Sequence, residues 1–148
     1  MKIINKDILT VESGYILHGC NAQRAMGSGV ALALKSKYPI VFDSYCALCD
    51  EYPFDFLRLG KYNFARINKN LAVINIISQL HYGYDGKRYS DYSAINQCFA
   101  GIAADIHYMP NNQVYLPYKI FSDRGGADWQ IISKMIDFYF PNAIVCKL

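Results

Sequence analysis

The segment from Gly19 to Pro39 holds residue types that suit the binding of an anionic ligand. Gly27 and Gly29 flank Ser28, between an apolar run typical of a strand and a run with helical spacing. Glycines at such a turn let backbone N–H groups approach an anion, and the start of a helix adds the positive end of its dipole. The turn therefore predicts a phosphate cradle, although tight turns also use glycine for packing alone.

A second glycine pair, Gly125 and Gly126, also stands just before a predicted helix. It follows a short predicted strand that ends at Leu116, in the segment LPYKIFSDRGGADW. Two turns of this kind on the same rim of a sheet would bracket a ligand with two linked phosphates and a sugar at either end. The alternative is that both glycine pairs serve packing.

His18, at the end of the strand before the first turn, and Asp123, in the second loop, are the candidates for proton transfer. The pKa of an ordinary histidine lies near neutrality, which suits general acid–base chemistry. Strand alternation could instead turn His18 into the core. Asp123 is either a catalytic carboxylate, which among phosphates needs a proton, a bridging water or the charge of Arg124, or a solvent-facing loop residue.

These residues require an alternating order of strands and helices to position them. Apolar patterns and breakers predict strands at residues 2–5, 15–21, 60–67, 71–78, 113–116 and 143–147, and helices at 30–37, 40–51, 91–108 and 127–140, with Ser90 or Asp91 as the cap of the third helix. The order predicts an α/β fold with a mixed sheet and helices on both faces. In such folds ligands bind beyond the carboxyl ends of the strands.

The 148 residues, 53% of them hydrophobic, predict a single domain covering residues 1–148. The apolar stretches are too short to span a membrane and no secretion signal is visible, so we expect a cytoplasmic protein, in the host cytoplasm if it is viral. The net charge of +3 is spread along the chain, and aromatic and basic residues do not alternate on one predictable face. We therefore expect a small anionic ligand and no nucleic-acid or membrane partner.

The five cysteines are an odd number, which favours reduced thiols over a disulfide framework. Cys46 and Cys49 fall within a predicted helix without a second pair at ligand spacing, so no metal site is predicted. No cofactor is expected either.

Four segments of the chain resemble the macrodomain family, most closely its ADP-ribose 1''-phosphate phosphatase-like members from fungi and phages. They are KDIL at Lys6–Leu9, HGCNAQRAMGSGVALALKSKYP at His18–Pro39, SQLHYGYDGKRYSDYSAI at Ser78–Ile95 and PYKIFSDRGGADW at Pro117–Trp129. The resemblance runs over nearly the whole chain. It implies a three-layer α/β/α macrodomain with a mixed central sheet flanked by helices.

The resemblance also implies a role for individual residues. Asp7, followed by Ile8, would contact the adenine amino group, Cys146 would lie near the adenine, and Asn21 would face the distal ribose. The first phosphate and ribose loop would comprise Gly27, Ser28, Gly29 and Val30, and the second Ser122, Asp123, Arg124, Gly125 and Gly126. Cys20 and Met26 would also bind the ligand. A branch of the family that removes ADP-ribose from acidic side chains or DNA bases has a lysine where this chain has Gln79, so a lysine adduct is not expected.

The activity implied is binding of ADP-ribose or a close derivative and hydrolysis of the terminal phosphate of ADP-ribose 1''-phosphate, with His18, Asn21 and Asp123 as catalytic candidates. Two alternatives remain. One is a non-catalytic reader or scavenger of ADP-ribose, and the other is a hydrolase that removes ADP-ribose from a modified acceptor. The expected partner is a nucleotide ligand, with an ADP-ribosylated protein as a further candidate.

Overall fold

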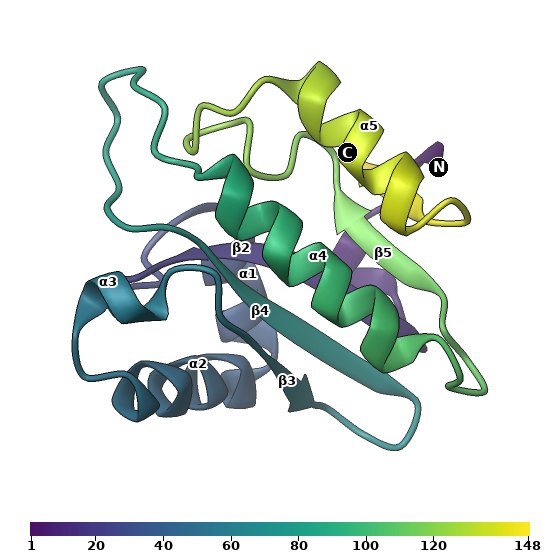
Figure 1. Cartoon of the computed structure of the whole chain (residues 1–148). Helices are drawn as coiled ribbons and strands as arrows, with labels where there is room; N and C mark the ends of the chain where they lie inside the picture. Colours follow the sequence, from purple (N-terminus) through teal and green to yellow (C-terminus); the bar gives the residue numbers. More distant parts are fainter.

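A six-stranded mixed sheet forms the middle layer of the computed structural model, which describes all residues 1–148 (Figure 1). The strands are β1 (Lys2–Asn5), β2 (Gly14–Asn21), β3 (Tyr62–Arg66), β4 (Leu71–Gln79), β5 (Val114–Pro117) and β6 (Ile144–Lys147). Their order across the sheet is β1-β6-β5-β2-β4-β3. Neighbours are parallel except β3, which pairs antiparallel with β4 through a hairpin. The predicted mixed sheet is confirmed.

Helices cover both faces of this sheet, as the sequence pattern predicts (Figure 1). The helices α1 (Gly29–Lys37) and α2 (Pro39–Glu51) lie on one face, and α4 (Tyr92–Ile106) and α5 (Trp129–Tyr139) lie on the other. Asp91 caps α4 by accepting the Ala94 N–H, at 2.9 Å. Two short elements escaped the sequence prediction, the 3₁₀ helix η1 (Ile8–Thr10) and the four-residue helix α3 (Asp55–Arg58).

Successive side chains of the central strands belong to two separate hydrophobic cores, one on each face of the sheet. Leu17 and Ile74 pack with the residues of α4 and α5. Ile16 and Val73, their neighbours in sequence, pack with those of α1 and α2. Because both faces are covered, β4 is an almost unbroken apolar run and not an alternating one, as expected of a central strand in an α/β sheet.

The strand order brings three connecting segments to one edge of the sheet. We name them the β2 loop (residues 22–28), the β4 loop (residues 80–91) and the β5 loop (residues 118–128), after the strands that they follow. Since β5, β2 and β4 are adjacent and parallel, their carboxyl ends meet at this edge. None of the helices is both long and apolar enough to cross a lipid bilayer.

Candidate functional site

A cavity of about 280 Å³ opens between the three loops. Its walls come from the end of β2, the β2 loop, the first turn of α1, the β4 loop and the β5 loop. Of the predicted site residues, the cavity is lined by His18, Cys20, Asn21, Met26, Gly27, Ser28, Gly29, Val30, Asp123, Arg124 and Gly125. Asp7, Ile8, Ser122, Gly126 and Cys146 do not line it.

The turn at Gly27–Gly29 presents its backbone to the cavity. A Cβ placed on Gly27 or Gly29 would meet no atom within 4 Å, and Gly29 has a φ of 61°. The N–H groups of Gly27 and Ser28 donate to no protein acceptor, and those of the first turn of α1 have no intrahelical acceptor. Ser28 is the N-cap residue of α1, yet its hydroxyl makes no capping hydrogen bond. These groups have no partner within the protein, as the predicted anion cradle would require, and the cradle itself stays a prediction.

Asn21 holds the β2 loop in place through both ends of its side-chain amide. The Nδ2 atom donates to Ala25 O at 2.9 Å, and Oδ1 accepts the Gln23 N–H at 2.8 Å. Tyr45 of α2 adds a hydroxyl that donates to Asn21 O at 2.6 Å. The Asn21 side chain, which the resemblance assigns to a ribose, is therefore already engaged in fixing the cradle.

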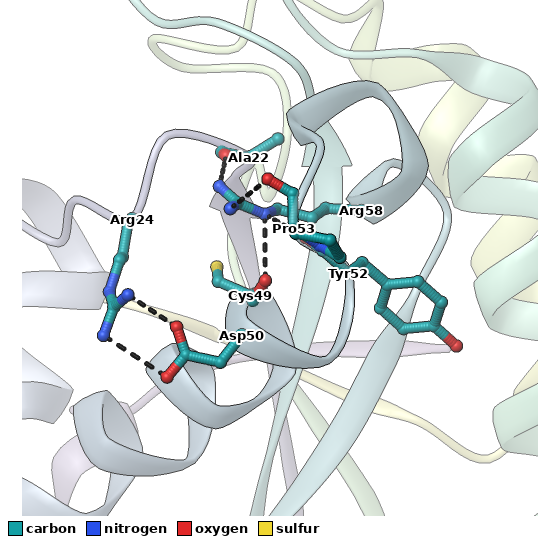
Figure 2. Close-up of polar contacts among 7 residues, drawn as sticks. All are labelled: Ala22, Arg24, Cys49, Asp50, Tyr52, Pro53 and Arg58. Carbon is teal, nitrogen blue, oxygen red and sulfur yellow. Dashed lines mark hydrogen bonds and ion pairs between the residues drawn. The ribbon is translucent and has the colours of Figure 1, made fainter.

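Two arginines fasten the outer side of the same loop to α2 and α3 (Figure 2). Arg58 donates to carbonyl oxygens of three segments, including Ala22 O at 2.8 Å and Tyr52 O at 2.8 Å. Arg24, at a φ of 63°, pairs with Asp50 of α2. A loop held by this many contacts is preorganised, so that a ligand pays little ordering entropy to bind it.

The glycines of the β5 loop serve packing, in contrast to those of the β2 loop. A Cβ on Gly125 would lie 2.3 Å from Ser90 Oγ and 2.5 Å from Phe121 O. One on Gly126, where φ is 70°, would lie 2.6 Å from Lys87 O. The carbonyl of Gly125 also accepts the N–H groups of Tyr89 and Ser90. These glycines let the β5 loop pack directly against the β4 loop.

The β5 loop nevertheless offers donors of its own to the cavity. The N–H groups of Asp123, Arg124 and Gly125, all cavity-lining residues, donate to no protein acceptor. Lys119 and Phe121 adopt positive φ values of 59° and 65°, which L residues rarely adopt. Strained backbone of this kind concentrates at functional sites.

Asp123 and Arg124 are exposed and do not pair with each other. The Arg124 guanidinium instead lies 4.2 Å from the ring centre of Tyr84, a cavity-lining residue of the β4 loop. The Asp123 carboxylate makes no hydrogen bond or ion pair. It is the only carboxylate among the cavity-lining residues.

His18 is a satisfied core histidine. It borders the floor of the cavity, but its exposed fraction is only 1%. Its Nε2 lies 2.6 Å from Asn75 Oδ1, and because Asn75 Nδ2 donates to Val41 O, that oxygen accepts from the ring. Burial lowers the pKa of His18 to about 4, against the opposing effect of the Asn75 hydrogen bond. The expectation of a pKa near neutrality is therefore wrong, because the ring has no access to water.

Because of this histidine, the free energy of unfolding is expected to decrease as the pH falls. The unfolded chain protonates His18 below its ordinary pKa of 6.5, whereas the folded chain does so only near 4. Stability contributed by the neutral ring is thus present above pH 6.5 and lost toward pH 4, by about 3 kcal/mol at about 1.4 kcal/mol per pH unit. Urea unfolding at a series of pH values measures this loss.

The control for this prediction is a pair of histidine substitutions. His18→Gln keeps an N–H donor for Asn75 and removes the titration, so its free energy of unfolding should fall less between pH 6.5 and 4. His81→Gln, at an exposed position, should retain the wild-type slope. Identical slopes in wild type and His18→Gln would refute the assignment.

The remaining predicted contacts lie outside the cavity walls. Asp7 caps η1 by accepting the Leu9 N–H at 3.0 Å. Cys146 is buried in β6, where burial raises the pKa of its thiol, and its carbonyl accepts the Tyr118 N–H. Gln79, in contrast, lines the cavity, and its amide Nε2 donates to His81 O at 2.9 Å.

Two tyrosines that line the cavity were not predicted from the sequence: Tyr84 on the β4 loop and Tyr118 at the start of the β5 loop. In a chain with 13 tyrosines neither stands out. The only available signal was position, since Tyr118 follows directly after β5 and Tyr84 lies midway along the β4 loop.

No protein-family model matches the chain. An uncharacterized 17.5 kDa protein of the tk-vs intergenic region of Enterobacteria phage T4 is 29% identical over 150 residues, which covers 94% of this chain and 89% of the phage protein. An ADP-ribose 1''-phosphate phosphatase of Aspergillus oryzae is 34% identical over 55 residues, or 36% of this chain and 27% of the fungal protein.

Solved structures align over almost the whole chain. A protein of unknown function from Bacteroides thetaiotaomicron is similar with a TM-score of 0.86 and 24% identity, covering 99% of this chain and 97% of that one. A macrodomain protein from Streptomyces coelicolor is similar with a TM-score of 0.79 and 20% identity, over 99% and 97% of the two chains. The chain has the macrodomain fold.

A further solved structure contains a ligand. The DarTG protein of Thermosipho africanus, in complex with ADP-ribose, is similar to this chain with a TM-score of 0.78 and 16% identity, over 99% of this chain and 41% of that protein. The predicted three-layer α/β/α architecture is thus confirmed, both by the strand order and by its similarity to solved macrodomains.

Proposed function

We propose that this macrodomain binds ADP-ribose or a close derivative in the cavity between the β2, β4 and β5 loops. The observation that carries the proposal is that two loops bring unpartnered donors to one cavity. The N–H groups of Gly27 and Ser28 on the β2 loop, and of Asp123, Arg124 and Gly125 on the β5 loop, belong to cavity-lining residues and have no protein acceptor. A diphosphate between the walls would satisfy both sets, with the dipole of α1 favouring its charge.

The two ends of the cavity differ in polarity, which suits a ligand with an aromatic base at one end and a sugar at the other. Toward β5 the walls are Pro117 and Tyr118, whose apolar and aromatic surfaces suit a purine base. Toward β4 they are Asn21, Ser78 and Gln79, whose polar groups suit a ribose. The Thermosipho africanus DarTG complex and a Trypanosoma brucei macrodomain complex, both with ADP-ribose, support the choice of ligand.

Hydrolysis of ADP-ribose 1''-phosphate to ADP-ribose and phosphate is the activity we propose for this site. The unpaired Asp123 carboxylate favours it, since a base at the cavity wall could take the proton of a water that attacks the terminal phosphorus as its bond to the ribose oxygen breaks. The similarity of part of the chain to the Aspergillus oryzae phosphatase supports the same reaction. With His18 buried and Asn21 engaged in the loop, Asp123 is the remaining catalytic candidate.

A panel of ligands tests binding and turnover together. Calorimetry with ADP-ribose, its 1''-phosphate, ADP and ribose 5-phosphate should show binding of the first two, and phosphate release should occur from the 1''-phosphate alone. Asp123→Asn should keep ADP-ribose binding and lower phosphate release by about 100-fold or more.

Each readout decides one part of the proposal. Failure of ADP-ribose to bind would overturn the binding function. Binding without phosphate release, together with no loss of ADP-ribose from a modified protein, would leave a non-catalytic reader. Loss of ADP-ribose from a modified acceptor, without phosphate release, would instead identify the hydrolase alternative.

A further inference from the structure

Two lysines flank a single tyrosine at the β5 end of the cavity. The ring of Tyr118, which lines the cavity, has the Nζ of Lys147 4.6 Å from its centre and that of Lys119 5.7 Å from it. Trp129 packs edge-on against the same ring at 5.3 Å. We call Tyr118, Lys119 and Lys147 the lysine–tyrosine corner. It gathers basic and aromatic groups that lie far apart in the sequence.

The strand order explains why these residues meet. Tyr118 and Lys119 follow β5, and Lys147 is the last residue of β6, the parallel neighbour of β5. The Tyr118 N–H donates to Cys146 O at 2.8 Å, which fixes the β5 loop beside the end of β6. The corner is therefore a fixed part of the rim and a direct continuation of the cavity wall.

The charges of the corner are not neutralised within the protein. Neither Lys119 nor Lys147 has a carboxylate within 4.0 Å, and both are exposed. The carboxylates of Asp7 and Asp128 instead accept backbone hydrogen bonds, from the Leu9 N–H and the Gln130 N–H respectively. Two unpaired cations at the rim favour an anion beside the cavity, separate from the diphosphate in the cradle.

We propose that the lysine–tyrosine corner binds a further phosphate, carried on the 2'- or 3'-hydroxyl of the adenosine ribose of the ligand. This inference rests on the proposed function, because it takes the base to lie at the Pro117–Tyr118 end and the diphosphate at Gly27–Gly29. In that orientation the adenosine ribose is the sugar nearest β5 and β6, and a phosphate ester on it leaves the cavity toward Lys119 and Lys147. The preferred ligand is thus an ADP-ribose phosphorylated on its adenosine side.

Calorimetry with ADP-ribose and ADP-ribose 2'-phosphate tests the corner directly. We expect the 2'-phosphate to bind about tenfold more tightly, as two exposed charge contacts would give. Lys147→Gln should reduce this preference to about threefold and leave the affinity for ADP-ribose itself unchanged, because Lys147 does not line the cavity. Lys69→Gln, an equal loss of charge in the β3–β4 turn at the opposite edge of the sheet, should leave the preference intact.

A second pair of probes separates this proposal from the proposed function. Adenosine 2',5'-bisphosphate and adenosine 3',5'-bisphosphate are compared with AMP, and the tighter of the two identifies the phosphorylated hydroxyl. One outcome would support the lysine–tyrosine corner and overturn the proposed function. In it, ADP-ribose does not bind, but a bisphosphate binds more tightly than AMP and Lys147→Gln abolishes this difference. The proposal that the corner binds a phosphate would be overturned if ADP-ribose and its 2'-phosphate bound with equal affinity. It would also be overturned if Lys147→Gln left the preference for the 2'-phosphate unchanged.

Discussion

Replacement of Gly27 by Val is expected to weaken ADP-ribose binding by about 100-fold or more and to leave the fold intact. A Cβ at this position meets no protein atom within 4 Å, and Gly27 lines the cavity. A valine side chain would occupy the volume proposed for the diphosphate and keep it from the N–H groups of Gly27 and Ser28. Loss of those charge-assisted hydrogen bonds corresponds to about 2.7 kcal/mol.

Calorimetry with ADP-ribose measures this loss, and urea unfolding checks the fold. The stability of Gly27→Val should stay within about 0.5 kcal/mol of wild type. Gly27→Ala should give an intermediate loss of affinity, because a methyl group fills less of the cradle. Gly86→Ala is a control for ligand affinity alone: its Cβ also meets open space, on a part of the β4 loop that does not line the cavity, but its φ of 76° makes alanine strained there. Unchanged affinity in Gly27→Val would place the diphosphate elsewhere.

Gly125→Ala, unlike Gly27→Val, is expected to destabilise the fold. Its free energy of unfolding should fall by about 3 kcal/mol. Its added methyl group would lie 2.3 Å from Ser90 Oγ and 2.5 Å from Phe121 O, so the β4 and β5 loops would have to move apart. The hydrogen bonds from Tyr89 and Ser90 to the Gly125 carbonyl would be strained by that movement. For a chain of this length, we expect the melting temperature to fall by about 10 °C.

Thermal and urea unfolding of Gly125→Ala measure this effect against Gly27→Ala, the same substitution at the open position. ADP-ribose affinity should also fall in Gly125→Ala, because the donors of the β5 loop shift with the backbone. A variant as stable as wild type would mean that the two loops separate at little cost, and that the close packing at Gly125 is dispensable.

The contrast between these two glycines shows how the site is built. One loop leaves space at its glycines for a ligand, and the other uses its glycines to bring two loops into contact. The β2 loop is further fixed by Asn21, Arg24 and Arg58, which tie it to its own backbone and to α2 and α3 (Figure 2). Binding therefore requires little rearrangement of the protein, and the affinity should come mainly from the donors already in place.

The amino-acid sequence by itself determined the elements and the fold class. Breakers such as Pro39 and caps such as Asp91 act locally, so helices and strands could be placed to within a few residues of their observed bounds. The glycine turn before α1 was recognisable for the same reason. The short helix α3 was not, because four residues give no periodic pattern.

Only the tertiary structure decided what each candidate residue faces. His18 and Asn21 lie three positions apart on one strand, yet the first is held beneath α2 by Asn75 and the second fixes the β2 loop, because partners on β4 and in the loop itself determine their contacts. The pairing of β5 with β6 brought Lys147 to Tyr118, which no local pattern encodes. Residue types and turns are local properties, whereas burial, pKa and neighbouring charge depend on strand order, which the sequence pattern leaves open.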